Sequence, residues 1–261
     1  MEGGVLLQIV WILLIGAVAG FLATWLGIGG CFLRIPMMMA LLGLSIKTAY
    51  AVNMAVIAIA TIPGVITHYR MKHVYKKGVI VAAIGAAVGV IIGTQIAMYV
   101  PSKTLKTIFG IACIGVGVYM TYSSIKSKGK MPPRVTVDQV GKLEHGLRLG
   151  GFMLLAGIAT GLCGFGGGIY YMPILNTLGY PMHIAIGTSS TQMIPVAAIG
   201  ATNLTIHGYQ NWFYVLTIGL VTMFFSWLGA RTTKIMKAWV LKGIFGILIG
   251  IIGLCVAIGL I

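Results

Sequence analysis

Two glycine clusters, each followed by a proline, interrupt otherwise apolar stretches of this sequence. The first lies in WLGIGGCFLRIP (25–36) and the second in GLCGFGGGIYYMP (161–173). Within a lipid bilayer a broken helix leaves backbone N–H and C=O groups that only protein or water can satisfy. A helix that starts after such a break presents free N–H donors and a partial positive charge. The clusters therefore predict two helix starts that can bind a small anion, unless the glycines serve only close helix crossing.

The predicted binding residues at the two breaks come from both clusters. They are Gly29, Gly30, Cys31 and Arg34 in the first, and Gly166, Gly167, Gly168, Tyr170 and Tyr171 in the second. A charge at membrane depth is costly and usually functional, although Arg34 could instead extend to the membrane surface. The two tyrosines are candidate contact or gating residues, or interfacial anchors. Pro36 and Pro173 are expected in the first turn of each new helix, where a missing N–H costs nothing.

A polar segment follows the second break. GTSSTQ (187–192) carries four hydroxyls and an amide, and the equivalent position of the first half is Asn53. Isolated hydroxyls usually bond to their own helix turn. A cluster of this density more often lines a cavity, so Asn53, Ser189, Ser190 and Gln192 join the predicted substrate-binding set.

The elements that must position these residues are membrane-spanning helices. The 261-residue chain is 59% hydrophobic and 8% charged, with a mean hydropathy of +1.02. Apolar runs near the length of a bilayer core recur, without the alternation of a β-barrel. The sequence therefore predicts an all-α polytopic membrane protein. Its helical segments are 5–26, 35–44, 48–67, 78–99, 104–123, 147–163, 169–179, 184–206, 212–230 and 239–260.

Charge excludes several classes of function. The net charge of +15 arises because only three acids are present, Glu2, Asp138 and Glu144, and none lies inside an apolar run. A cation transporter usually needs a buried carboxylate, and an excess of Lys and Arg in loops is typical of membrane topology, so no nucleic-acid partner is expected. No GxSxG or HExxH motif and no CxxC spacing is present, which argues against an enzyme, a metal site or a cofactor.

The two halves of the chain resemble each other at a constant offset. GIGGCFLRIP matches GFGGGIYYMP, and LKTIFGI matches LKGIFGI, with partners 136 or 137 positions apart. The predicted organisation is a first membrane repeat (1–125), a cytoplasmic linker (126–146) and a second membrane repeat (147–261). Each repeat contains about five helical segments, of which one is a short helix after the glycine break.

Loop charges predict the orientation. HYRMKHVYKK (68–77) is strongly basic while its partner HGYQNW (207–212) has no Lys or Arg. ARTTKIMK (230–237) is likewise more basic than its partner VPSKTLK (100–106). Because basic loops stay in the cytoplasm, each repeat has an odd number of crossings and the repeats are inverted, as in many secondary transporters. Both termini are then extracytoplasmic.

At this point the motifs resemble a known family. GFGGGIYYMPIL followed by IAIGTSSTQ is similar to the signature of the TauE/SafE family of membrane permeases, the sulfite exporter family, with Cys31 where a third glycine is more common in the first copy. The resemblance covers nearly the whole chain. It implies a duplicated fold, a prokaryotic inner membrane, and transport of small sulfur-containing anions such as sulfite, thiosulfate or organosulfonates.

The predicted function is a secondary transporter, an exporter of such an anion, which works by alternating access at a site between the two broken helices. The alternative is a passive channel for small anions, because the same helix ends would serve it.

Overall fold

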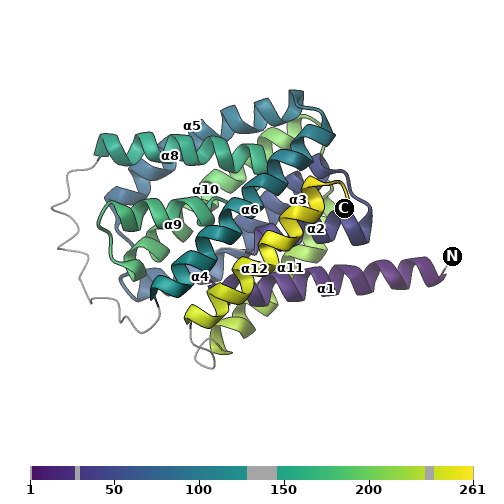
Figure 1. Ribbon diagram of the computed structural model, residues 1–261, viewed down its shortest axis with the longest axis horizontal. Coiled ribbons are helices and arrows are strands. Elements are labelled where there is room, and N and C mark those ends of the chain that lie inside the picture. Colours follow the sequence, from purple (N-terminus) through teal and green to yellow (C-terminus); the bar gives the residue numbers. More distant parts are fainter. Residues whose placement is uncertain (1, 27–29, 128–145, 233–237, 261) are drawn as a thin grey trace.

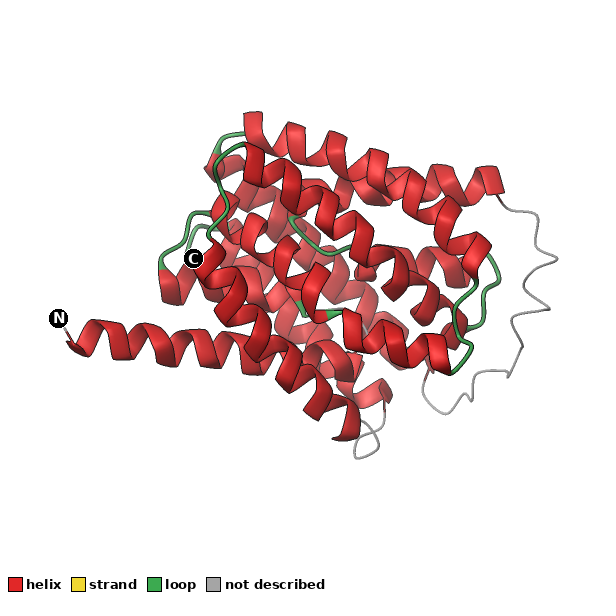
Figure 2. Ribbon diagram, turned by 180° about the vertical axis from the view of Figure 1, so that it is seen from behind, coloured by secondary structure: helices red, strands yellow, loops and turns green. Residues whose placement is uncertain are grey.

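The computed structural model describes residues 2–26, 30–127, 146–232 and 238–260 (Figures 1 and 2). All regular secondary structure in these ranges is helical, which confirms the predicted all-α polytopic fold. Among the described residues, five stretches are long and apolar enough to cross a membrane. They are Ile46–Arg70, Lys76–Tyr99, Ser102–Lys126, Gly146–Cys163 and His183–Ile206.

The helices follow the predicted apolar segments closely. In the first half they are α1 (Glu2–Leu26), α2 (Cys31–Leu42), α3 (Ile46–Ala60), α4 (Ile62–Arg70), α5 (Lys76–Tyr99) and α6 (Ser102–Ser127). In the second half they are α8 (Gly146–Cys163), α9 (Gly168–Thr177), α10 (Met182–Ile206), α11 (Trp212–Thr232) and α12 (Ala238–Ala257). Most of the predicted linker, residues 128–145, lies outside the described residues.

One predicted helix is in fact two. The segment expected over 48–67 is divided at Thr61 into α3 and α4, because Pro63 in the first turn of α4 has no N–H to continue the hydrogen bonding of α3. The start of α3 is fixed by Ser45, whose side chain accepts a 3.2 Å hydrogen bond from the backbone N–H of Thr48. Such a cap satisfies a donor that the helix itself cannot.

Left-handed glycines bound the two short helices. Gly30 (φ 61°) precedes α2 and Gly43 (φ 63°) follows it. Gly167 (φ 80°) precedes α9, and Gly179 (φ 93°) lies just beyond its end. Only glycine adopts this backbone conformation without strain, so the glycines determine where each helix begins and ends.

The prolines do not lie where the sequence reasoning placed them. Pro36 and Pro173 are inside α2 and α9, at the sixth residue of each helix, and not in the first turn. The left-handed glycine starts each helix earlier than expected. A proline at this depth cannot donate to the carbonyl four residues before it, so the carbonyls of Phe32 and Ile169 lose their usual helix partner.

The main helix interfaces join the two halves. α5 packs along α8, α6 along α12, and α1 along α11, while α3 and α10 cross at the centre. In the sequence repeat α1 corresponds to α8, α2 to α9, α3 to α10, α5 to α11 and α6 to α12. If each helix of one half is exchanged for its equivalent in the other, the main contacts are the same. The core therefore consists largely of contacts between the halves.

Glycines allow two of these pairs to approach closely. A Cβ on Gly89 would meet the carbonyl oxygen of Leu154, and a Cβ on Gly93 would meet that of Ile158. A Cβ on Gly16 of α1 would similarly lie 2.6 Å from the side chain of Val221 of α11. Close packing of helices at small residues thus accounts for these glycines.

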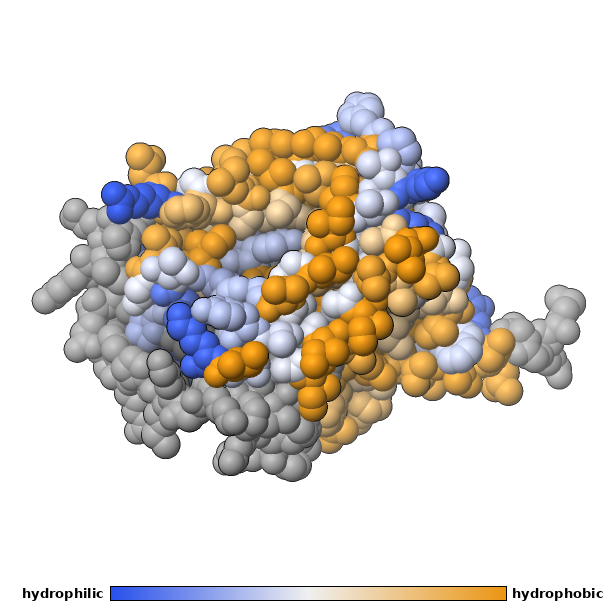
Figure 3. Space-filling view, viewed as in Figure 1, coloured by the Kyte–Doolittle hydropathy of each residue, from blue (hydrophilic) through white to orange (hydrophobic). Residues whose placement is uncertain are grey.

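The outer surface is suited to lipid. Ile80, Ile84 and Val88 of α5 are exposed along one side of that helix, as are Leu216 and Leu220 of α11. Hydrophobic residues cover much of the face seen in Figure 3. In Figure 1 the N-terminus of α1 and the C-terminal end of α12 lie at the same end of the bundle, while α6 ends and α8 begins at the opposite end.

Candidate functional site

The second glycine break is buried in the bundle and packs on α3. α8 ends at Cys163, α9 begins at Gly168, and the residues between them are all buried. A Cβ on Gly164 would collide with the ring of Tyr50 at 2.5 Å, and one on Gly166 would meet the side chain of Ile57. The break lies in the interior of the protein, against one face of α3.

Asn53 links this break to α2. Its Nδ2 donates a 2.7 Å hydrogen bond to the carbonyl oxygen of Gly164, and its Oδ1 accepts a 2.7 Å bond from Arg34 Nη1. Arg34 is 1% exposed and Asn53 is fully buried. The structure thus does not show the surface-directed alternative for Arg34, because its side chain ends inside the bundle.

Arg34 has an unbalanced charge. Its known side-chain partner is a neutral amide, and no ion pair connects it to a carboxylate within the described part of the chain. Its buried Nε has no hydrogen-bond partner. Leaving a buried charge unpaired is strongly unfavourable, so this guanidinium has both a charge and a donor available for an anion.

The starts of the two short helices, α2 and α9, lie next to each other. The buried Cys31, the first residue of α2, forms a hydrogen-bonding contact with the backbone of Gly166, two residues before α9. Each start contributes N–H groups without intrahelical partners and the positive end of a helix dipole. Gly29, also predicted in the site, lies outside the described residues, whereas Gly30 is buried.

Tyr171 covers the start of α9. The end of its ring lies where a Cβ on Gly167 would project, with the phenolic oxygen 2.7 Å from that position. Tyr171 is fully buried and its hydroxyl has no hydrogen-bond partner. Thr160 of α8 is adjacent, and its hydroxyl is also buried without a partner. The two hydroxyls are neighbours, but their geometry is not that of a hydrogen bond.

Sequence reasoning missed Thr160. The signal was available, because Thr160 is the last polar side chain before the second break and lies one helical turn before Gly164. A single hydroxyl in an apolar helix ordinarily bonds to its own turn, so its position in the sequence does not by itself predict a site residue.

The polar segment of α10 is only partly associated with this site. Thr188 accepts a 3.1 Å hydrogen bond from the backbone N–H of Tyr75, in the basic loop. Gln192 Nε2 contacts Met153 Sδ at 3.4 Å and its Oε1 has no partner. Ser189 is buried and Ser190 half-buried, and among the described residues neither hydroxyl bonds to the glycine break.

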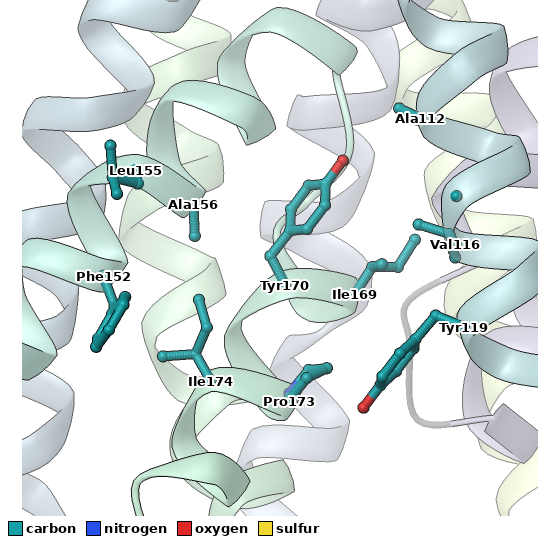
Figure 4. Close-up of a pocket in the computed structure, with 11 residues that line it drawn as sticks. Ala112, Val116, Tyr119, Phe152, Leu155, Ala156, Ile169, Tyr170, Pro173 and Ile174 are labelled. Atoms are coloured by element: carbon teal, nitrogen blue, oxygen red, sulfur yellow. The ribbon is translucent and has the colours of Figure 1, made fainter. Parts of the chain in front are cut away.

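Tyr170 faces a different space from its neighbour Tyr171. It lines a cavity of about 450 Å³ between α6, α8 and α9, shown in Figure 4 with its apolar lining, which includes Val116, Phe152 and Ile174. The hydroxyl of Tyr170 contacts the Cys163 thiol. The residues that line this cavity include no cation, so it does not suit a hydrated anion.

Comparisons with known proteins agree on the kind of protein. Residues 12–256 match the family described as Sulfite exporter TauE/SafE. A probable membrane transporter protein of Methanocaldococcus jannaschii is 26% identical and covers 97% of both chains. YdhB of Bacillus subtilis, also named a probable membrane transporter, is 24% identical over 88% of this chain and 93% of its own. No solved structure matches the chain.

Proposed function

From the premise that this chain belongs to the TauE/SafE family of sulfite exporters, we propose that it exports a small sulfur-containing anion, either sulfite, thiosulfate or an organosulfonate. The chain is a multi-pass membrane protein of a transporter family. We also propose that it lies in a prokaryotic inner membrane. The role is transport and not catalysis.

The observation that carries the proposal is the unbalanced charge of Arg34. The guanidinium is 1% exposed, bonds to a neutral amide and retains an unpartnered Nε. Burying such a group is costly unless an opposite charge is supplied. A transported anion supplies that charge when it binds, and a cation would meet only repulsion.

The surroundings of Arg34 support an oxyanion in particular. The starts of α2 and α9 meet beside it through Cys31 and Gly166. Backbone N–H groups at helix starts bind phosphate and sulfate in many proteins. A sulfite or sulfonate group presents several acceptor oxygens, which can be shared between a guanidinium and such N–H groups.

The relation between the halves supports alternating access. In Figure 1, α1 and its equivalent α8 run in opposite directions, and so do α6 and α12. These directions and the exchange of helix contacts support the inverted repeats, 1–125 and 147–261, proposed from the sequence. Rocking one half against the other would open a central site to each side in turn.

The orientation of the protein in the membrane bears on the driving force for anion export. The basic loop before α5 would be cytoplasmic and both termini extracytoplasmic. An inside-negative potential favours anion exit by about 2.3 kcal/mol per charge per 100 mV. Export of a monovalent anion therefore needs no coupling ion.

The test compares two arginines. Arg34→Gln should weaken sulfite binding by about 10- to 100-fold, as expected for loss of a charged hydrogen-bonding partner, and should abolish sulfite efflux from proteoliposomes. Arg70→Gln, on the exposed basic loop, should change neither. Arg34→Gln should also raise the melting temperature without anion, because it removes an unpaired buried charge. Normal sulfite binding by Arg34→Gln would refute the proposal.

The same assay separates a transporter from a channel. Turnover that saturates with sulfite concentration is expected of alternating access. Single-channel conductance across a planar bilayer would instead identify a passive pore.

A further inference from the structure

Two neighbouring hydroxyls are buried at the second break without hydrogen-bond partners. Thr160 Oγ1 belongs to α8 and Tyr171 Oη to α9, and both residues are fully buried. Threonine in a helix usually bonds to its own preceding turn, as Thr94 does with the carbonyl oxygen of Val90 at 2.7 Å. Thr160 does not adopt this arrangement. Buried polar groups without partners are rare in proteins and require an explanation.

The position of the hydroxyls provides that explanation. Tyr171 folds back over Gly167, which caps α9, so its phenolic oxygen lies beside the positive end of this ten-residue helix. Thr160 approaches the same point from α8. Both hydroxyls can donate, and helix N–H groups without intrahelical partners are nearby. Hydroxyl groups without partners therefore gather beside the free N–H groups of this helix start.

The Arg34 site lies along the same short break. Arg34 is connected through Asn53 to Gly164, and Tyr171 covers Gly167 three residues further on. Arg34 and Tyr171 also occupy equivalent positions of the two halves, 137 residues apart. One half supplies a charged donor at this position and the other half a neutral one.

We infer that Thr160 and Tyr171 form an uncharged subsite that binds oxygen atoms of the transported anion whose charge Arg34 neutralises. The inference rests on the proposed function and specifies its substrate class. The site would take a polyatomic oxyanion, with one part at the guanidinium and acceptor oxygens at the two hydroxyls. A halide ion has no second atom to place at the hydroxyls, so the subsite would discriminate sulfite from chloride.

Three substitutions that each remove one buried hydroxyl test this inference. Thr160→Val and Tyr171→Phe remove the proposed contacts, and Thr222→Val is the matched control. Thr222 on α11 is 1% exposed and its hydroxyl also lacks a partner, but it packs against Gly20 of α1. Binding of sodium sulfite and of sodium chloride is measured on the purified full-length protein by calorimetry and by thermal shift.

The expected result is a loss of about 10-fold in sulfite affinity for Thr160→Val and for Tyr171→Phe, near the effect of one lost hydrogen bond. Chloride affinity should not change, and Thr222→Val should bind both anions like the wild type. Melting temperatures without anion should be equal or higher in all three variants, because each removes an unsatisfied buried group.

Three other results would overturn the inference, and they differ in meaning. If Arg34→Gln loses sulfite while Thr160→Val and Tyr171→Phe bind it normally, the subsite is wrong and the proposed function stands. If the wild-type protein binds no sulfite, thiosulfate or sulfonate, the proposed function is wrong and the subsite fails with it. An equal loss of affinity in Thr222→Val would also count against a specific subsite.

Discussion

Asn53 Nδ2 donates a 2.7 Å hydrogen bond to the carbonyl oxygen of Gly164, 111 residues away in the other half of the chain. The same side chain accepts from Arg34. One amide therefore satisfies a backbone carbonyl freed by the glycine break and orients the buried guanidinium. The amide is neutral, so it orients the guanidinium without cancelling its charge.

Asn53→Asp should supply the missing counter-charge within the protein. A carboxylate at this position would pair with Arg34 and repel an incoming anion, which should reduce sulfite affinity on the order of 100-fold. Binding is measured by calorimetry. Asn203→Asp is the control, since Asn203 of α10 bonds to Gln95 and Thr94 and not to Arg34. Unchanged sulfite affinity in Asn53→Asp would mean that the anion does not meet Arg34.

The charge around the site also predicts substrate preference. Isethionate and taurine both carry a sulfonate, but taurine has an ammonium where isethionate has a hydroxyl. Among the described residues no carboxylate forms an ion pair with Arg34, and a second cation beside the guanidinium is repelled. Isethionate should therefore bind at least about 10-fold more tightly than taurine in a competition assay against sulfite. Equal affinities would contradict the proposed arrangement.

The α5–α8 interface should not tolerate an added methyl group at Gly89. A Cβ there would meet Leu154 O and lie 2.9 Å from the Cα of Gly157. Gly89→Ala should destabilise the protein by about 1–3 kcal/mol, the usual cost of overpacking. Thermal unfolding in detergent measures the effect. At Gly115 of α6 nothing lies within 4 Å of the added atom, so Gly115→Ala should be neutral or stabilising by up to about 1 kcal/mol.

Two histidines of the basic loop and the neighbouring His183 predict a dependence on pH. Burial, and after it the neighbouring His183, lower the pKa of His73 below its usual value. The two rings are 4.9 Å apart, and His68 is 6.0 Å from His73 on the other side. The exposed Arg70 and Lys72 of the same loop add further positive charge.

The direction of the effect follows from that lowered pKa. The folded state disfavours the protonated ring of His73, so the protein should lose stability as the pH falls below about 6.5, the unperturbed value for histidine. The melting temperature of the His73→Asn variant should change less between pH 7.5 and pH 5 than that of the wild-type protein. His207→Asn is the control, because this ring bonds to its own helix at Asn203 O. If His73→Asn left the pH dependence of the melting temperature unchanged, His73 would not be its cause.

The sequence was sufficient to predict the helices and the positions of the two breaks. Apolar runs of bilayer length place the ends of α5 and α10 to within two residues and those of α6 to within four. Left-handed glycines can be located because few other residues adopt that conformation. The short helices α2 and α9 were predicted from the same glycines. Their prolines were misplaced, since the sequence alone does not show how many residues of the new helix come before the proline.

The side-chain partners within the site could not be predicted in the same way. The bond from Asn53 to Gly164 and the proximity of Thr160 to Tyr171 depend on which helices of the two halves meet, and periodicity along one helix does not specify its neighbour. For the same reason Ser189 and Ser190 are equivalent to Asn53 in sequence, whereas within the described ranges Asn53 bonds to the second break and the two serines do not. The repeat indicates which positions correspond, but the structure determines what each of them contacts.

The pairing of α1 with α11, α5 with α8 and α6 with α12 has a consequence for biogenesis. When only the first six helices have been synthesised, one helix of each of these three pairs is present and its partner is not. The glycine face of α5 must then stay in the lipid until α8 is inserted. The nascent chain is therefore most vulnerable midway through synthesis, and a fragment that stops in the linker should be degraded by membrane proteases.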